Sequence, residues 1–246
     1  MPTLSLATYA RIARFAGLLY LIDFVTAGIA PVQVLPRLVE SGNPVATAAN
    51  IQHSAWMMHL AVAGDLVTAL CEVALSALFY TLFRSVDRNL ALLMAFFRLV
   101  YTAVVTVNVF NLYAPLRLLG DDSHLTGFSA EQRAGLAMHS LDAYHDGFTV
   151  ALLFFGAHIL ALGALIYRSR YAPRLLGAWL VVASVGFFVH SIGNLAVPDA
   201  GVSMLVVAPS ALGELALLLL LLFNRVNRQP SGPSPVDVQS VARTEG

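Results

Sequence analysis

The chain has 246 residues, of which 58% are hydrophobic and only 11% are charged. A soluble domain usually has about 25% charged residues, so this composition indicates a membrane protein. The formal net charge is zero, without the basic excess of a nucleic-acid-binding protein, so we expect no nucleic acid among its partners.

The basic and sulfur-containing residues exclude several kinds of chemistry. All 14 basic residues are arginines, so no lysine can form a Schiff base or act as a nucleophile. The single cysteine, Cys71, excludes an intrachain disulfide and a multi-cysteine metal cluster.

Six apolar segments are found along the chain at residues 15–30, 56–83, 89–114, 148–167, 175–197 and 204–223. Each comes close to the roughly 20 residues that cross ~30 Å of hydrocarbon. The sequence therefore predicts an all-α membrane bundle of six transmembrane helices, with residues 1–224 as one domain.

The first segment resembles a signal peptide, because Arg11 and Arg14 precede it. We predict that it is retained, since Asp23 lies within the run and Pro31 directly follows it. Residues 31–55 are predicted to form an external loop with a short helix lying at the surface.

The remaining connections are short or polar. Residues 115–127 are predicted to form a second external loop. Residues 225–246 are rich in Ser, Pro and Gln, so we predict a disordered cytoplasmic tail.

The fourth span belongs to the longest helical segment. Ser129 and Gln132 form a capping-box pattern that opens a helix, and an apolar run extends from residue 148 to 167. Arg168 and Arg174 lie at its other end, where Pro173 stops the helix.

The arginines set the expected orientation. They collect before the first span, between spans two and three, between spans four and five, and after the sixth. By the positive-inside rule, both termini face the cytoplasm, and we predict a multi-pass protein of the cell inner (plasma) membrane.

Every predicted span carries at least one polar side chain. These residues are Asp23, Asp65, Glu72, Arg98, Asn108, Asp142, His145, Asp146, His190, Asn194 and Glu214. Charged groups at membrane depth cost several kcal/mol each unless they are paired or hydrated, so we expect these faces to turn inward together. Counting residues from the membrane ends places Glu72, Arg98 and Glu214 near the middle and the others in the outer third. We therefore predict a polar pocket that opens outward.

Two sets of candidate site residues follow. The candidate catalytic residues are Glu214, Arg98, Glu72 and Asp65. The candidate substrate-binding residues are Asp23, Asp142, His145, Asp146, His190, Asn194 and Tyr101.

Each set has a structural alternative. Arg98 is equally well explained as a buried partner of Glu72 or Glu214. Asp23 and Asp65 are near enough to the surface to be hydrated interfacial groups. A polar network that only fixes helix packing, with His190 and Asn194 as interhelical hydrogen-bonding groups, also fits the pattern.

A metal site is a possible interpretation of the fourth span, where Asp142, His145 and Asp146 share one helical face. The pattern has no second copy on another helix, so we expect no metal and no cofactor. His158 follows His145 by thirteen residues, which is about 220° around a helix, so it is expected to face elsewhere.

Five short phrases occur together in a recognisable order. They are AFFRL at 95–99, LDA at 141–143, FGAH at 155–158, PRLLG at 173–177 and GEL at 213–215. With these phrases, roughly residues 10–224 resemble the bacterial domain-of-unknown-function 4386 family of integral membrane proteins. The resemblance implies a six-span membrane protein and no particular reaction. In that family a histidine directly follows the Asp-Ala pair, whereas this chain has Tyr144 there and His145 one residue later.

Three functions are compatible with these observations. The first is binding or acid–base conversion of a small lipophilic molecule, of lipid or isoprenoid type, within the bilayer. The second is proton-coupled transport of a small molecule, for which a homo-oligomer would supply further helices. The third is a non-catalytic assembly partner. Whether the protein is an enzyme stays open, because no G-x-S-x-G, H-E-x-x-H or phosphate-loop motif is present.

Overall fold

The computed structural model of the chain describes residues 6–120, 125, 127–169, 171–197 and 201–223. Across these residues the chain forms helices and turns, with no β-strand. Six of its helical segments are long and apolar enough to cross a membrane, which confirms the predicted number of spans. The predicted tail, residues 225–246, lies outside the described part of the chain.

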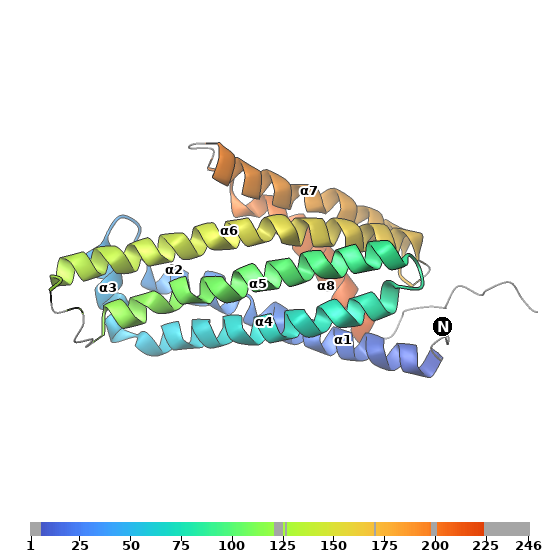
Figure 1. Ribbon diagram of the computed structural model, residues 1–246, viewed down its shortest axis with the longest axis horizontal. Coiled ribbons are helices and arrows are strands. Elements are labelled where there is room, and N and C mark those ends of the chain that lie inside the picture. The colour runs from blue at the N-terminus through green and yellow to red at the C-terminus, as the bar shows by residue number, and fades with distance from the viewer. Residues whose placement is uncertain (1–5, 121–124, 126, 170, 198–200, 224–246) are drawn as a thin grey trace, which may run out of the picture.

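The long helices form a closed ring. They are α1 (Leu6–Thr26), α4 (Ala55–Phe83), α5 (Arg88–Leu118), α6 (Ala130–Arg168), α7 (Arg174–Ala196) and α8 (Ala208–Leu222). Each packs on the next in chain order, and α8 returns to pack on α1. Figure 1 shows α4, α5 and α6 as long rods lying side by side, with α7 flanking α6.

Local signals in the sequence start these helices where they were expected. The Ser129 hydroxyl accepts a hydrogen bond from the Gln132 N–H, and the Gln132 side chain accepts one from the Ser129 N–H, so the predicted capping box opens α6. At the start of α5, the Asp87 carboxylate accepts a hydrogen bond from the N–H of Leu90 at 3.0 Å.

The first predicted loop is wrong over part of its length. Helical structure resumes after α1 as a π-helical turn, η1 (Ile29–Val34), and as α2 (Leu35–Leu38), so the first span runs to Leu38. Pro31 does not stop it, because the first residues of a helical segment need no N–H donor. The short helix expected in this region is α3 (Pro44–His53).

The second predicted loop begins too early. Helix α5 continues through Pro115 to Leu118. Pro115 lies in its last turn, where only one helical N–H is lost, and its carbonyl accepts a hydrogen bond from the N–H of Leu119 at 3.0 Å.

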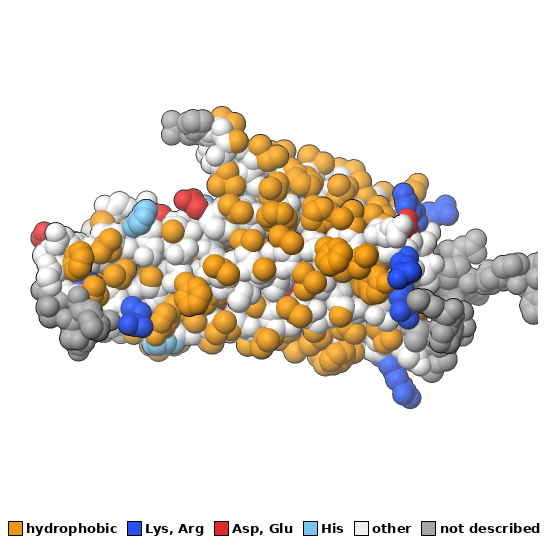
Figure 2. Space-filling view, in the orientation of Figure 1, with side chains coloured by type: hydrophobic (Ala, Val, Ile, Leu, Met, Phe, Trp, Pro, Cys, Tyr) orange, Lys and Arg blue, Asp and Glu red, His pale blue; other side chains and the backbone are white. Residues whose placement is uncertain are grey.

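Hydrophobic and arginine side chains are distributed as a membrane protein requires. On the face in Figure 2, hydrophobic groups cover the middle of the bundle. Arginine side chains gather at the end where α4 passes into α5 and α6 into α7 (Figure 2).

Helices α6 and α7 approach each other closely through two glycines. A Cβ atom added to Gly177 would lie 2.7 Å from the carbonyl oxygen of Gly163 and in contact with the backbone of Tyr167. A Cβ added to Gly163 would lie 2.9 Å from the N atom of Val181. These neighbours are backbone atoms that cannot turn away, so only glycine permits this separation.

We predict that Gly177→Ala destabilises the protein although alanine favours helices. Overpacking of this kind typically costs about 1–3 kcal/mol, which exceeds the gain of ~1 kcal/mol from replacing a helical glycine. The matched control is Gly135→Ala in α6, where an added Cβ meets no atom within 4 Å. Denaturant unfolding in detergent micelles measures both. Equal or greater stability of Gly177→Ala would contradict the close approach.

Candidate functional site

Arg98 of α5 lies at the centre of the bundle. Its side chain is completely buried and makes an ion pair with Glu72 of α4. Arg98 Nη2 donates a hydrogen bond to Glu72 Oε1 at 2.8 Å, and Arg98 Nε is in ion-pair contact with Glu72 Oε2. The structure therefore supports the alternative in which Arg98 is a buried partner of Glu72.

His158 of α6 completes the contacts of the guanidinium. Arg98 Nη1 lies 2.8 Å from His158 Nε2, and His158 Nδ1 lies 3.1 Å from the carbonyl oxygen of Met94. Because arginine can only donate, Nε2 must accept, and Nδ1 then carries the hydrogen that it donates to Met94. His158 thus acts as a neutral acceptor in this arrangement.

Aromatic rings surround the same guanidinium. Arg98 Cζ lies 5.4 Å from the ring centroid of Tyr20, 5.2 Å from that of Phe79 and 6.0 Å from that of Phe155. Ring faces attract a cation, most strongly where water is absent. Tyr101, a predicted binding residue, is buried beside Phe155 with ring centroids 4.7 Å apart.

Glu214 attaches α8 to this cluster through Tyr20. The Tyr20 hydroxyl donates to Glu214 Oε2 at 2.7 Å, and the Ser210 hydroxyl donates to Glu214 Oε1 at 3.2 Å. Glu214 is therefore held by two neutral donors, and its carboxylate links α8 to α1.

Asp23 of α1 is the third carboxyl group of the cluster. It is only 6% exposed, and its carboxyl group lies beside that of Glu72. The expectation that Asp23 is a hydrated interfacial group is wrong, because the approach of α1 to α4 buries it. We define the central cluster as Tyr20, Asp23, Glu72, Arg98, His158 and Glu214.

Asp65 forms a separate buried pair. The hydroxyl of Tyr144 donates to Asp65 Oδ2 at 2.8 Å, and both side chains are buried. Asp65 precedes Glu72 by seven residues, about 10 Å along α4. Asp65 is therefore buried between helices rather than hydrated, and it is not a member of the central cluster. Its partner is Tyr144, the residue after the Leu-Asp-Ala phrase.

Asp142, His145 and Asp146 do not join the interior. All three side chains are exposed, which corrects the expectation that they turn inward. They lie 22 to 26 residues before Arg168, or about 33 to 39 Å along the helix, which exceeds a hydrocarbon thickness of ~30 Å. The 39-residue α6 is much longer than a span, so counting from one membrane end misplaced these groups.

His190 and Asn194 hold a connection together. The Asn194 side chain accepts a hydrogen bond from the N–H of Val202 at 2.8 Å and donates to the carbonyl of Val202 at 3.0 Å. His190 Nδ1 lies 3.1 Å from the same carbonyl. Both residues therefore satisfy the backbone ahead of the 3-10 turn η3 (Met204–Val207), far from Arg98 in the chain.

Asn108 links α5 to α6, and Asn111 supports it from the same helix. Asn108 donates to the carbonyl of Tyr144 at 2.7 Å, and Asn111 donates to Asn108 at 2.9 Å. Among the described residues, no group of three or more His, Cys, Asp or Glu side chains is placed to hold a metal ion.

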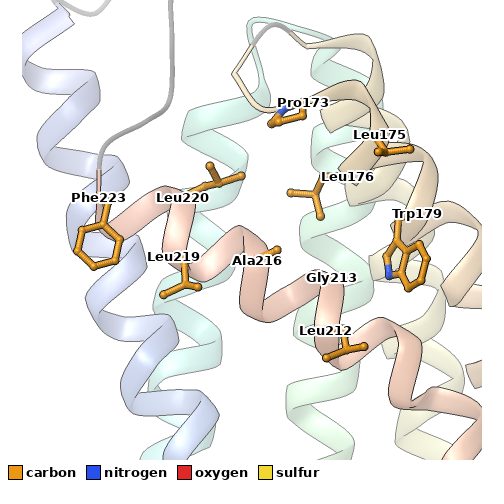
Figure 3. A pocket seen from close by; sticks show the side chains of 10 residues that line it. All are labelled: Pro173, Leu175, Leu176, Trp179, Leu212, Gly213, Ala216, Leu219, Leu220 and Phe223. Atoms are coloured by element: carbon orange, nitrogen blue, oxygen red, sulfur yellow. The ribbon is translucent and has the colours of Figure 1, made fainter.

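A second candidate site is an apolar groove of about 910 Å³ between α7 and α8. It is lined by Pro173, Leu175, Leu176, Trp179, Leu212, Gly213, Ala216, Leu219, Leu220 and Phe223 (Figure 3). Sequence reasoning did not find this groove, because an apolar residue facing a groove and one facing lipid look alike in a sequence. It also missed Tyr20, Ser210 and the approach of His158 to Arg98.

Helix α8 crosses from one neighbour to another, and this crossing forms the groove. At its start, Trp179 Nε1 donates to the carbonyl of Pro209 at 2.8 Å, and Gly213 lies against Leu180 of α7. At its end, the backbone of Leu221 and Leu222 lies against Gly17 of α1. Helices α7 and α8 are therefore in contact near the start of α8 and diverge towards its end, which leaves the groove between them.

Comparison with known proteins identifies the family. An uncharacterized protein of Archaeoglobus fulgidus is 27% identical over 128 residues, which are 52% of this chain and 63% of that relative. The match thus spans less than two thirds of that relative's length. No solved structure matches the chain. Residues 15–224 match the family described as Domain of unknown function (DUF4386), so the chain belongs to the DUF4386 family.

Proposed function

We propose that the protein binds a small lipophilic molecule, of lipid or isoprenoid type, in the groove between α7 and α8. The size and lining of that groove carry the proposal. At about 910 Å³ it falls within the range of roughly 300–1,000 Å³ that is typical of ligand sites, and its lining is apolar. Since the lining residues belong to two membrane-spanning segments, a ligand would enter from the bilayer.

At one end of the groove, α7 and α8 are held together by specific contacts. Trp179 is held by its hydrogen bond to the Pro209 carbonyl, and an added Cβ at Gly213 would lie 2.6 Å from Leu180 Cδ2. These contacts set where a bound chain or ring must stop. A fixed end wall distinguishes a binding groove from the uneven surface that any helix pair presents to lipid.

Helix α8 separates the groove from the acidic groups. Gly213 lines the groove, while the next residue, Glu214, faces Tyr20 in the core. Acid–base conversion of a bound molecule would require Glu214 to reach it, because Glu72, Arg98 and Asp65 do not line the groove either. Binding is therefore the step that the geometry favours, and any conversion depends on a movement of α8.

Proton-coupled transport of such a molecule is a second candidate. It is favoured by one observation, namely that Asp23, Glu72 and Glu214 surround a single guanidinium. Carboxyl groups buried within membrane-spanning helices often form proton relays in pumps and transporters.

We also propose that both termini face the cytoplasm of a cell with the protein in its inner (plasma) membrane. The end of the bundle where α4 passes into α5 carries Arg84 and Arg88, and the passage from α6 to α7 carries Arg168 and Arg174. An excess of arginine in short loops marks the cytoplasmic side.

The orientation predicts the behaviour of reporter fusions. A reporter fused after Gly246 that is active only in the cytoplasm should be active, and one that needs export should be inactive. A pair of reporters inserted after Gly42, in the turn between α2 and α3, should give the opposite result. The proposed orientation fails if the C-terminal fusion is exported.

Filling the groove predicts a loss of bound ligand. Ala216→Trp places an indole in the groove, whereas Ala211→Trp adds the same group to an exposed position of α8 outside it. We expect mass spectrometry of lipophilic molecules retained in native membrane discs to show a loss of at least about tenfold for Ala216→Trp, equivalent to ~1.4 kcal/mol.

The two tryptophan variants also separate specific binding from general contact with lipid. Ala211→Trp should retain the wild-type ligand profile, and circular dichroism should show both variants folded. Unchanged retention in folded Ala216→Trp, or no molecule enriched over bulk lipid in the wild type, would contradict binding in the groove.

A further inference from the structure

Three buried carboxyl groups face one guanidinium in the central cluster. Glu72 is paired with Arg98, Glu214 accepts hydrogen bonds from Tyr20 and Ser210, and Asp23 contacts Glu72. If all three were ionised, the cluster would hold three negative charges against one positive charge. Such an excess of buried charge is strongly unfavourable.

Two carboxyl oxygens in this cluster lack a hydrogen-bond donor. They are Asp23 Oδ1 and Glu72 Oε2, and both are buried. Glu72 Oε2 has ion-pair contact with Arg98 Nε, although the two groups are not oriented as a hydrogen bond. The Asp23 and Glu72 carboxyl groups lie side by side, and each carries a buried oxygen without a donor, so two groups that can only accept when ionised are placed together.

We propose that the Asp23 carboxyl is a proton-binding site, which holds one proton at neutral pH and donates it in a hydrogen bond to the Glu72 carboxylate. The proton is taken up from water, and the Asp23 carboxylate becomes a neutral carboxylic acid. This gives the acceptor pair a donor and removes one negative charge from the bundle. The proposal goes beyond ligand binding in the groove and does not depend on it.

The other groups that face the cluster are less suited to hold this proton. Glu72 is kept ionised by its ion pair with Arg98, and Glu214 already has two donors. His158 accepts from Arg98 through Nε2 and uses Nδ1 for Met94, so neither nitrogen is free. The titratable or charged groups around the cluster are Tyr20 and Asp23 of α1, Cys71 and Glu72 of α4, Arg98 and Tyr101 of α5, His158 of α6, and Glu214 of α8.

Infrared spectroscopy tests the proposal directly, because a protonated carboxylic acid has a carbonyl band distinct from that of a carboxylate. The wild-type protein in lipid discs at neutral pH should show such a band, and Asp23→Asn should lose part of it. Asp146→Asn, a matched change at an exposed aspartate, should leave the band unchanged. Asp23→Asn should also fold with an unfolding midpoint near that of the wild type, because the asparagine amide can donate to Glu72 as the acid does.

A second measurement keeps the proposal testable if Asp23→Asn does not fold. The Asp65→Asn variant removes the other buried aspartate of the described chain. In this variant, carbon-13 labelling of aspartate should shift the infrared carbonyl band of the protonated carboxylic acid. A band that does not respond to this label, or that is unchanged in folded Asp23→Asn, would show that Asp23 is ionised and would overturn the proposal.

Discussion

The structure depends on one constraint: a guanidinium that cannot lose its charge is buried in the middle of a membrane bundle. Arginine stays protonated in proteins, so Arg98 must be neutralised and hydrogen-bonded where it lies. Glu72 supplies the charge, His158 supplies an acceptor, and the ring faces of Tyr20 and Phe79 cover the plane. These partners come from α1, α4 and α6, so the position of Arg98 on α5 fixes the mutual orientation of four helices.

The same centre governs the part of the molecule that we propose to bind a ligand. Glu214 fastens α8 to α1 through Tyr20, while Trp179 fastens the start of α8 to α7. A helix fixed to α7 at its start and to α1 farther along must cross the gap between them, and the groove is the space that this crossing leaves. Changes around Arg98 that move Tyr20 would therefore be transmitted to α8.

Much of the fold follows from the sequence because it is set by local rules. Apolar length predicts the six spans, and the capping box at Ser129 places the start of α6. Prolines are weaker stop signals than expected. Pro31 lies in the first turn of a helical segment, which needs no N–H donor, and Pro115 lies in the last turn of α5, where a single helical hydrogen bond is lost. The site was predicted only in part. Glu72, Arg98, Glu214 and Tyr101 are buried as expected, but Asp142 and His145 are not, because a 39-residue helix extends well beyond the hydrocarbon.

The partners that were missed depend on rotations between helices. The sequence gives only the angle between His158 and His145 around the helix, and that angle does not determine which neighbouring helix His158 contacts. Tyr20 looks like any aromatic residue in an apolar run, and its role appears only when α1 and α8 pack together. A single sequence contains no information on such pairings between helices that are almost two hundred residues apart.

A double-mutant cycle on Arg98 and Glu72 tests the central claim most directly, with methionine as the substituent at each position. Removal of one partner of a buried ion pair costs about 3–5 kcal/mol, because the remaining charge is left uncompensated, whereas removal of both can be nearly neutral. We therefore expect Arg98→Met and Glu72→Met each to be strongly destabilised and the double variant to recover most of the loss. Stabilities that simply add, with the double variant worst of all, would show that the pair does not act as one unit and would contradict this account.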